Sequence, residues 1–183
     1  MTALQIIDFF YADEADLRHL LLHHSLQVRD RALLVADCHP ELAVDRGLLE
    51  RGALLHDIGI GLCDAPSIHC HGSRPYIEHG PLGARMLREL GDAELEPVAR
   101  ICERHTGTGL PGFEPETLEE QIVCYADKFY SKSHPERTRT PEQTAESLRR
   151  FGEHCAARFW EWHALFKVPS DSSLKGEDGN RGQ

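Results

Sequence analysis

Apolar residues recur at helical spacing over most of the chain. Between residues 23 and 37, for example, His24, Val28 and Ala32 fall on one face of a helix. Pro40 then closes this segment, because proline cannot continue a helix. No segment alternates apolar and polar residues convincingly enough to indicate a strand. The pattern therefore predicts an all-α fold.

Capping signals indicate where several helices begin and end. Thr117 and Glu120 have capping-box spacing, and Thr140 precedes a proline that suits the first turn of a last long helix. Gly91 provides a stop for the helix before it. We expect helices over residues 3–11, 13–19, 23–37, 48–57, 79–90, 92–105, 117–129 and 140–166.

Three segments lack a helical pattern. Residues 61–78 are irregular, and an irregular stretch of this length in a compact domain is more often functional than not, so we expect a lid or wall of a site. Residues 106–112 form a glycine-rich loop. Beyond Pro169 the chain is polar and unpatterned. We therefore expect one domain over residues 1–169 and a disordered tail over residues 170–183.

Composition and charge narrow the class of protein. The chain has 183 residues, 40% of them hydrophobic, which is ordinary for a soluble domain that buries a real core. No apolar stretch approaches membrane-spanning length, and the N-terminus lacks the basic start of a secretory signal, so we expect a cytoplasmic protein. The formal net charge is -10, without a basic stripe, which argues against nucleic acid or a membrane as a partner. Any phosphate-bearing substrate must meet local positive charge, which metal ions can supply.

The six cysteines are spread along the chain without a C-x-x-C pair, a pattern that favours free thiols. Four residues within one short segment, Cys63, His69, Cys70 and His71, suggest a separate zinc site as an alternative. Their spacing is poor for zinc, whose modules present ligands in tight pairs.

The run Leu54 to Gly59 places a histidine beside a carboxylate at the end of an apolar helix. Gly59 and Gly61 stop this helix, and their backbone freedom lets the adjacent His56 and Asp57 face one ion. A capped helix end with a histidine near the C-terminal dipole explains the dipeptide equally well. Other residues of the chain must decide between the two interpretations.

Two of these residues are His24, on an early helix, and Asp127, in Tyr125-Ala126-Asp127-Lys128 on a late one. With His56 and Asp57 between them, the chain resembles the HD-domain superfamily of metal-dependent phosphohydrolases, in particular the subgroup with Ile-Gly after the His-Asp pair. The resemblance covers about residues 20–132. It implies an all-α HD-domain helical bundle with a metal site at its centre.

The resemblance also implies a ligand set. His24, His56, Asp57 and Asp127 match the superfamily's metal ligands position by position. His79 and His105 fall where two-metal members place the ligands of a second ion, with Asp57 as the bridging carboxylate. Such a nitrogen and oxygen set suits iron, manganese, cobalt, nickel or zinc. Two such ions would hold a hydroxide that attacks the phosphorus atom.

The chain departs from the family pattern in the residues that meet phosphate. Many members have lysine where this chain has Ile60, so the phosphate contacts must come from elsewhere. Lys128, Arg104 and the backbone amides of residues 106–109 are candidates, although Lys128 fits a structural ion pair equally well. Leu110 replaces the tyrosine of the Gly-Tyr-Pro signature found in cyclic-dinucleotide phosphodiesterases of the superfamily.

The function predicted from these residues is a metal-dependent phosphohydrolase of a nucleotide or a related small phosphorylated metabolite. Asp57, Lys128 and Arg104 are its candidate catalytic residues. Two alternatives stay open: a di-iron oxygenase of the HD type, and a metal-dependent binding protein without turnover. An exposed apolar face on the last, aromatic-rich helix would favour a homodimer.

Overall fold

The computed structural model describes residues 1–107 and 111–173, and it confirms the all-α prediction. The α-helices are α1 (Ala3–Tyr11), α2 (Ala15–Cys38), α3 (Arg46–Leu55), α4 (His79–Glu89), α5 (Glu96–Arg104), α6 (Leu118–Asp127), α7 (Pro141–Leu148), α8 (Glu153–Phe166) and α9 (Ser170–Ser173). Short 3-10 turns are η1 (Pro40–Leu42), η2 (Ile60–Leu62), η3 (Pro66–Ile68), η4 (Tyr76–Glu78), η5 (Ala93–Leu95) and η7 (Arg149–Phe151).

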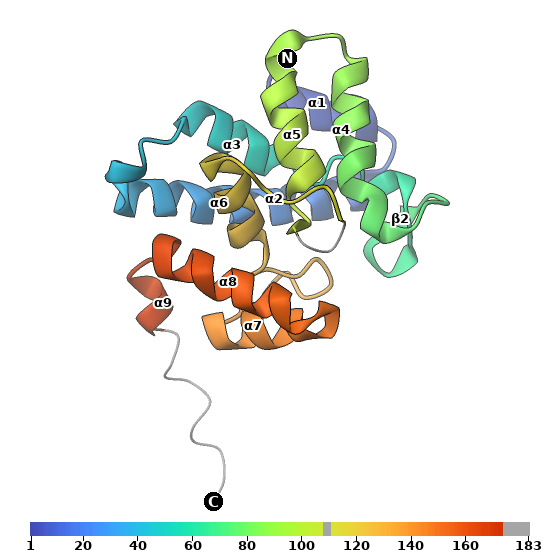
Figure 1. Cartoon of the computed structure of the whole chain (residues 1–183). Coiled ribbons are helices and arrows are strands. Elements are labelled where there is room, and N and C mark those ends of the chain that lie inside the picture. The colour runs from blue at the N-terminus through green and yellow to red at the C-terminus, as the bar shows by residue number, and fades with distance from the viewer. Residues whose placement is uncertain (108–110, 174–183) are drawn as a thin grey trace, which may run out of the picture.

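Helix α2 runs through the middle of the molecule, with α4 and α5 on one side and the α7 and α8 pair on the other (Figure 1). Its buried face contributes to two apolar clusters. Leu17 and Leu21 pack with α1, α4 and α5, whereas Val28 and Ala32 pack with α3, α6 and α8. His24 lies on the same face between the two sets, so the sequence of α2 places a polar residue at the junction of the two apolar clusters.

Helix α2 is longer than the sequence pattern predicted. The expected helices over residues 13–19 and 23–37 form one helix from Ala15 to Cys38. Neither proline nor glycine interrupts residues 19–23. Leu17 and Leu21 also continue the buried stripe that His24 and Val28 extend, so burial favours one continuous helix.

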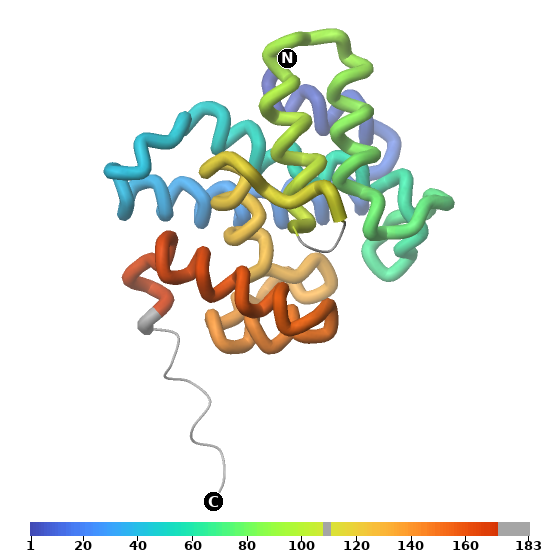
Figure 2. The backbone as a smooth tube through the Cα atoms, in the orientation of Figure 1, coloured from blue at the N-terminus to red at the C-terminus, as the bar shows by residue number. Residues whose placement is uncertain are grey.

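The last long helix is instead divided at Gly152. This residue has φ +120°, a value that side chains other than glycine's rarely allow, and it separates α7 and η7 from α8. The chain doubles back here, so α7 and α8 pack side by side, as the orange segment of Figure 2 shows. The predicted cap at Thr140 is confirmed, with Gln143 completing a capping box.

The expected boundary at residue 169 falls too early. Residues 170–173 form the short helix α9, and Asp171 is 4% exposed. Its carboxylate lies 2.5 Å from Nη2 of Arg31 in α2 and accepts a hydrogen bond from the backbone amide of Val168 at 3.0 Å. The guanidinium of Arg31 also stacks 3.3 Å from the ring centre of Phe129. The prediction of a disordered tail is therefore wrong for Asp171, and residues 174–183 lie outside the described part of the chain.

The irregular segment over residues 61–78 contains a small hairpin that the pattern did not predict. Strand β1 (Asp64–Ala65) pairs antiparallel with β2 (Cys70–His71), with Asp64 opposite His71 and Ala65 opposite Cys70. Strands of two residues are too short to show an alternating pattern in a sequence. The hairpin leads into η4 and then into the first residue of α4, His79.

Two glycines bring α4 against the turn that carries Asp57. A Cβ on Gly59 would lie 2.3 Å from the carbonyl oxygen of His79, and one on Gly83 would lie 2.6 Å from Sγ of Cys102. Gly59 has an ordinary φ of −89°, so the backbone freedom expected from the sequence is not what requires a glycine here. A glycine is required because the backbone of α4 lies too close to leave room for a side chain. This contact sets how near His79 comes to Asp57.

No helix within residues 1–107 and 111–173 is long and apolar enough to cross a membrane. On α8, Phe159, Trp162 and Phe166 pack inward, whereas Trp160 and Leu165 are exposed. The expected homodimer depends on this outer face and stays a prediction.

Candidate metal centre

The residues singled out in the sequence meet at one place because most of them lie at helix ends. His56 immediately follows α3, His79 is the first residue of α4, His105 immediately follows α5, and Asp127 is the last residue of α6. His24 instead projects from the interior of α2. The cluster therefore forms where the ends of these helices converge.

One oxygen of Asp57 belongs to a first set of ligand atoms. Its Oδ2 lies 3.2 Å from Nε2 of His24 and 3.0 Å from Nε2 of His56. Oδ1 of Asp127 closes the set, 3.0 Å from Nε2 of His24 and 3.6 Å from Nε2 of His56. These four residues form a group that can hold a metal ion.

The other oxygen of Asp57 belongs to a second set. Its Oδ1 lies 3.2 Å from Nε2 of His79 and 3.4 Å from Nε2 of His105, and these two nitrogens are 2.9 Å apart. Neighbouring ligand atoms bound at about 2.1 Å to one ion lie about 3 Å apart when their bonds are at right angles. Both sets have this spacing, and Asp57 belongs to both.

Backbone carbonyl groups orient three of the histidine rings. Nδ1 of His56 lies 2.7 Å from the carbonyl oxygen of Ala53, and Nδ1 of His105 lies 2.6 Å from that of Cys102. His79 makes the same contact with Tyr76 at 2.5 Å. An Nδ1 that donates its proton to a carbonyl leaves the lone pair of Nε2 available for a metal. Each of these Nε2 atoms faces Asp57.

The buried carboxylate of Asp57 fits a cation. The residue is 0% exposed, and neither oxygen has a hydrogen-bond donor of good geometry among the described residues. Burial alone would raise the pKa of Asp57, but the positive charges of His56 and Lys132 outweigh burial and hold the pKa well below its usual value. Asp57 is therefore ionised, as a metal ligand must be.

The histidines of the two sets differ in their pKa. Burial lowers the pKa of His56, but Asp57 and Asp127 outweigh burial and raise it to about 9. The pKa of His105 is lowered to about 3, mainly by burial. The charges of His56 and His79 lower it further, because they oppose another positive charge nearby. A divalent ion must therefore displace a proton from the first set but none from His105.

Lys132 also contacts the bridging carboxylate, and the sequence patterns did not indicate it. Its Nζ lies 2.6 Å from Oδ2 of Asp57, and its side chain is 12% exposed. Burial would lower the pKa of Lys132, but Asp57 reverses the effect and raises it, so the ammonium stays charged. Lys132 follows α6 in an irregular loop, where no helical periodicity assigns it to a face.

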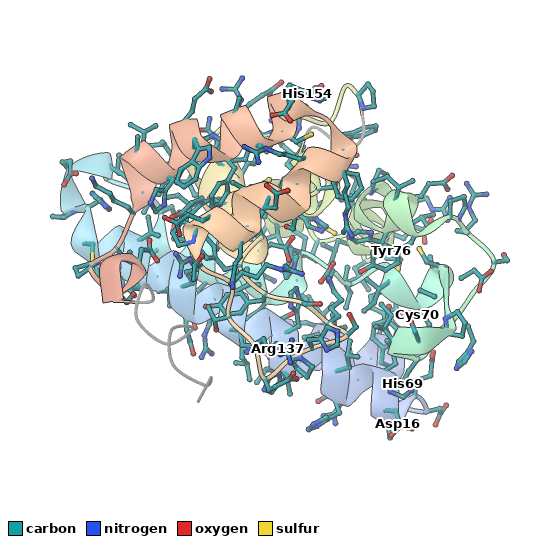
Figure 3. The ribbon with its side chains drawn as sticks, turned by 90° about the horizontal axis from the view of Figure 1, so that it is seen from below. Asp16, His69, Cys70, Tyr76, Arg137 and His154 are labelled. Carbon is teal, nitrogen blue, oxygen red and sulfur yellow. The ribbon has the colours of Figure 1, made fainter. Side chains whose placement is uncertain are left out.

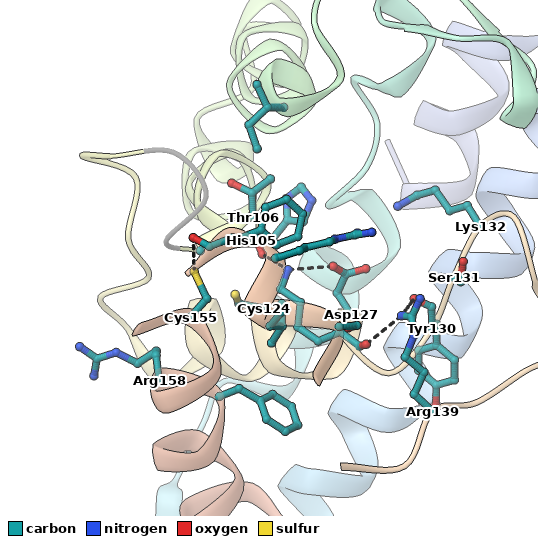
Figure 4. Close-up of a pocket in the computed structure, with 18 of the residues that line it drawn as sticks. His105, Thr106, Cys124, Asp127, Tyr130, Ser131, Lys132, Arg139, Cys155 and Arg158 are labelled. Carbon is teal, nitrogen blue, oxygen red and sulfur yellow. Dashed lines mark hydrogen bonds and ion pairs between the residues drawn. The ribbon is translucent and has the colours of Figure 1, made fainter. Parts of the chain in front are cut away.

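A cavity of about 470 Å³ opens over the metal centre. His79, His105 and Asp127 contribute to its floor, and the α7 and α8 pair contributes the opposite wall (Figure 4). Five cations line it: Lys128, Lys132, Arg139, Arg150 and Arg158. Among the described lining residues Asp127 is the one carboxylate, so the cavity has an excess of positive charge although the whole chain is acidic.

The two cations expected to meet phosphate lie in different places. Lys128 lines the cavity, with its Nζ 3.1 Å from Oδ2 of Asp127 and 3.1 Å from the carbonyl oxygen of His105. Arg104 instead donates to the carbonyl oxygen of Glu114 and lies 3.0 Å from Oε1 of Glu116. It is not among the cavity-lining residues. Of these two candidate cations, only Lys128 therefore lies on the cavity.

The segment over residues 61–78 forms part of the wall, as expected. Tyr76 and Ile77 line the cavity, and the ring of Tyr76 lies 4.6 Å from that of His79. His69 is exposed and lies away from Tyr76, on the side of Asp16 (Figure 3).

The alternative zinc site does not assemble. The metal-holding groups among the described residues are the two that share Asp57, and neither includes Cys63, His69, Cys70 or His71. The expected backbone contacts from residues 106–109 fall partly outside the described chain, since residues 108–110 are not included.

Residues 21–131 match the model of the HD domain family. The relatives include a tRNA (cytidine(56)-2'-O)-methyltransferase of Picrophilus torridus, 35% identical over 124 residues that cover 61% of this chain and 32% of that protein. An uncharacterized protein of Methanocaldococcus jannaschii is 39% identical over 123 residues, which cover 60% of this chain and 65% of that protein. A Ribonuclease Y of Acidothermus cellulolyticus is 33% identical over 117 residues, 64% of this chain and 21% of that protein. The chain thus spans less than two thirds of each of these relatives. No solved structure matches it.

Proposed function

Because the chain belongs to the HD-domain family of metal-dependent phosphohydrolases, we propose that it hydrolyses a phosphoester or phosphoanhydride bond of a small phosphorylated metabolite. A nucleotide is the substrate class we favour. Two divalent transition-metal ions, chosen from iron, manganese, cobalt, nickel and zinc, are its cofactors in this proposal.

The observation that carries the proposal is the position of Asp57, with one oxygen in each set of ligand atoms. His24, His56 and Asp127 would hold one ion with Oδ2, and His79 and His105 would hold the other with Oδ1. When bound, such a pair of ions activates water and binds the oxygens of a phosphoester. The protein's own contribution is to fix this spacing and to exclude bulk water.

Lys132 and Lys128 supply the charge that the family's usual lysine would otherwise provide at the position of Ile60. Both line the cavity beside the ligand carboxylates. Because its pKa is raised, Lys132 cannot act as a base near neutral pH. Its role in the proposal is to attract the phosphate group and to stabilise the negative charge that grows in the transition state.

The same charge separates the leading proposal from its alternatives. A di-iron oxygenase would use a similar ligand set, but five cations around the cavity favour an anionic substrate. The volume of about 470 Å³ is in the range of pockets that enclose small molecules. RNA is a competing substrate class, because two of the relatives are named for a tRNA methyltransferase and a ribonuclease.

Phosphate release from a panel of substrates tests the proposal. Purified protein with added manganese, cobalt, nickel, iron or zinc is given nucleoside monophosphates, diphosphates, sugar phosphates and a short single-stranded RNA. We expect phosphate from a nucleotide with at least one metal. Release of mononucleotides from the RNA alone would move the function to nuclease, and oxygen consumption with iron, without any phosphate release, would favour the oxygenase. Metal binding without either reaction would leave a binding protein.

Substitution of Lys132 tests its role within this mechanism. Lys132→Gln should lower kcat by about 100-fold, because one preorganised charge is lost at the reacting group. The bound metal should remain near the wild-type amount by elemental analysis, since Lys132 is not a ligand in the proposal. Lys132→Arg, which keeps the charge, should recover part of kcat. A Lys132→Gln enzyme with unchanged kcat would assign the lysine to charge balance with Asp57.

A further inference from the structure

Arg139 is a cavity cation with an unusual set of partners. Its Nη1 donates to the carbonyl oxygen of Lys128 at 3.2 Å and to that of Tyr130 at 3.0 Å, at the end of α6. Its own backbone amide donates to the carbonyl oxygen of Phe129 at 2.9 Å. These contacts fix the guanidinium on the cavity wall without neutralising its charge.

Most other cations of the cavity are paired with a carboxylate. Lys132 lies 2.6 Å from Asp57, Lys128 lies 3.1 Å from Asp127, and Arg158 lies 2.8 Å from Glu161. Among the described residues no carboxylate forms an ion pair with Arg139 or with Arg150. Arg139 is also half-buried, so its charge is partly removed from water without a counter-charge.

The pKa of Arg139 agrees with a charge that is partly buried without a nearby counter-charge. Burial lowers its pKa below the usual arginine value; Asp127 opposes the shift, and Arg150 adds to it. Both arginines line the cavity. In Figure 4, Arg139 lies on the same side as Lys132 and Tyr130, whereas Arg158 lies at the opposite end.

An arginine held in this way is suited to an oxyanion. A guanidinium has five N–H donors in a planar fork, and here the contacts to carbonyl oxygens use only Nη1. The remaining donors suit the two oxygens of a phosphate or carboxylate, which arginine binds in bidentate geometry. Lys132 and Lys128 are engaged at the metal centre, so Arg139 marks a second position for negative charge.

We propose that Arg139 and Arg150, which both line the cavity, form a second anion subsite, and that the natural ligand is a nucleotide carrying a second phosphate group. One phosphate lies at the metal centre with Lys128 and Lys132, and the other lies on the two arginines. The nucleotide part of this statement rests on the proposed function. The subsite itself requires only binding and no turnover.

Binding of two analogues that cannot be hydrolysed tests the subsite. The ligands are an adenosine derivative with a 5′-phosphonate and its counterpart with phosphonates at both 3′ and 5′ positions, titrated calorimetrically into the metal-loaded protein. We expect the bisphosphonate to bind about 10- to 100-fold more tightly, the range for charge-assisted hydrogen bonds. In Arg139→Gln this preference should fall to near unity.

Arg150→Gln provides a second test of the subsite, and Arg149→Gln provides its control. Arg150 is exposed, and its guanidinium stacks on Phe151 and makes no hydrogen bond to the backbone in the described part of the chain. Arg150→Gln should therefore fold normally and reduce the preference several-fold, even if Arg139→Gln folds poorly. Arg149→Gln is the matched control, because Arg149 pairs with Glu146 and Glu153 and does not line the cavity. It should keep the wild-type preference.

The outcomes separate the subsite from the proposed function. Equal affinity of the wild-type protein for the two analogues, or a preference that survives both Arg139→Gln and Arg150→Gln, would overturn the subsite. Phosphate release from nucleotides would then still support the hydrolase. A preference that depends on Arg139 in a protein without hydrolytic activity would uphold the subsite and overturn the hydrolase instead.

Discussion

Asp57 is the residue on which both sets of ligand atoms depend, since each of its oxygens faces different imidazole nitrogens. It also balances the positive charges of His56 and Lys132 in a site that water does not reach. We therefore expect the loss of this side chain to affect metal binding, activity and stability together.

Asp57→Ala should abolish activity and remove both ions, whereas His105→Ala should remove mainly the ion of the second set. Elemental analysis of the two purified variants measures this difference. Asp57→Ala should also lower the free energy of unfolding by about 3 to 5 kcal/mol, because buried positive charge is left without a partner. Two equivalents of metal in Asp57→Ala would show that the carboxylate does not bridge.

The raised pKa of His56 predicts how metal affinity depends on pH. His56 must lose its proton to bind an ion, so affinity for the first set should rise about tenfold per pH unit up to about pH 9 and then level off. Calorimetry in buffers of different ionisation enthalpy should detect about one proton released per first ion at pH 7.5. A titration without proton release would contradict this assignment.

The raised pKa of His56 also affects the metal-free protein, whose stability should fall as the pH rises, whereas metal affinity should increase. A histidine whose pKa is raised by folding stabilises the fold fully below its unfolded value of about 6.5, and this stabilisation is lost as the pH rises through about 9. Melting temperatures of the stripped protein should therefore fall over this interval.

At the residue scale, the family resemblance named six candidate ligands, and the structure brings all six into the two groups that share Asp57. The sequence did not predict Lys132, whose contact with Asp57 joins an irregular loop to a turn far earlier in the chain. It named Arg104 as a candidate for phosphate contact, but the sequence alone does not reveal that Glu114 and Glu116 lie beside that side chain.

At the scale of elements, the approach of α4 to the Asp57 turn controls the second set. Gly83→Ala would place a methyl group 2.6 Å from Sγ of Cys102 and 2.8 Å from the backbone nitrogen of Gly59, so α4 must move away. We expect reduced occupancy of the His79 and His105 set and a loss of about 1 to 3 kcal/mol of stability. Metal equivalents and the melting temperature measure the two effects.

Gly47→Ala is the control for this variant. Gly47 is also helical, but a Cβ there has an ordinary contact of 3.4 Å with Oδ1 of Asp45. It should keep both ions and gain up to about 1 kcal/mol of helix stability. Equal metal content in the two glycine variants would show that the close contact does not position His79.

The elements themselves were largely predictable, and their boundaries less so. Periodicity and caps located α4, α5 and α6 within a few residues. The merging of two expected helices into α2 depends on the burial of Leu17 and Leu21 against α1 and α4, which is tertiary information. The division at Gly152 depends on a positive φ, and a single glycine within an apolar helical pattern does not reveal that conformation.

At the scale of the whole molecule, Asp171 joins the end of the described chain to α2. Asp171→Ala should lower the free energy of unfolding by about 3 to 5 kcal/mol, since Arg31 would be left buried and unpaired. For a chain of this size the melting temperature should fall by roughly 10 °C.

Asp30→Ala is the matched control, because this carboxylate is 67% exposed and pairs with the neighbouring Arg29. An exposed pair contributes at most about 1 kcal/mol, so the melting temperature should change little. If Asp171→Ala has the same melting temperature as the wild type, the contact with Arg31 does not stabilise the position of α9.

The division of the cavity between two parts of the chain has a consequence for how such proteins diversify. The match to the HD domain ends at residue 131, whereas Arg139, Arg150 and Trp162, which line the opposite wall, all come later. The residues of the candidate metal centre and the wall on the opposite side of the cavity therefore occupy consecutive stretches of sequence. In the proposed hydrolase, substrate selectivity could therefore change by substitutions that follow residue 131, while the six candidate ligands and the proposed reaction stay the same.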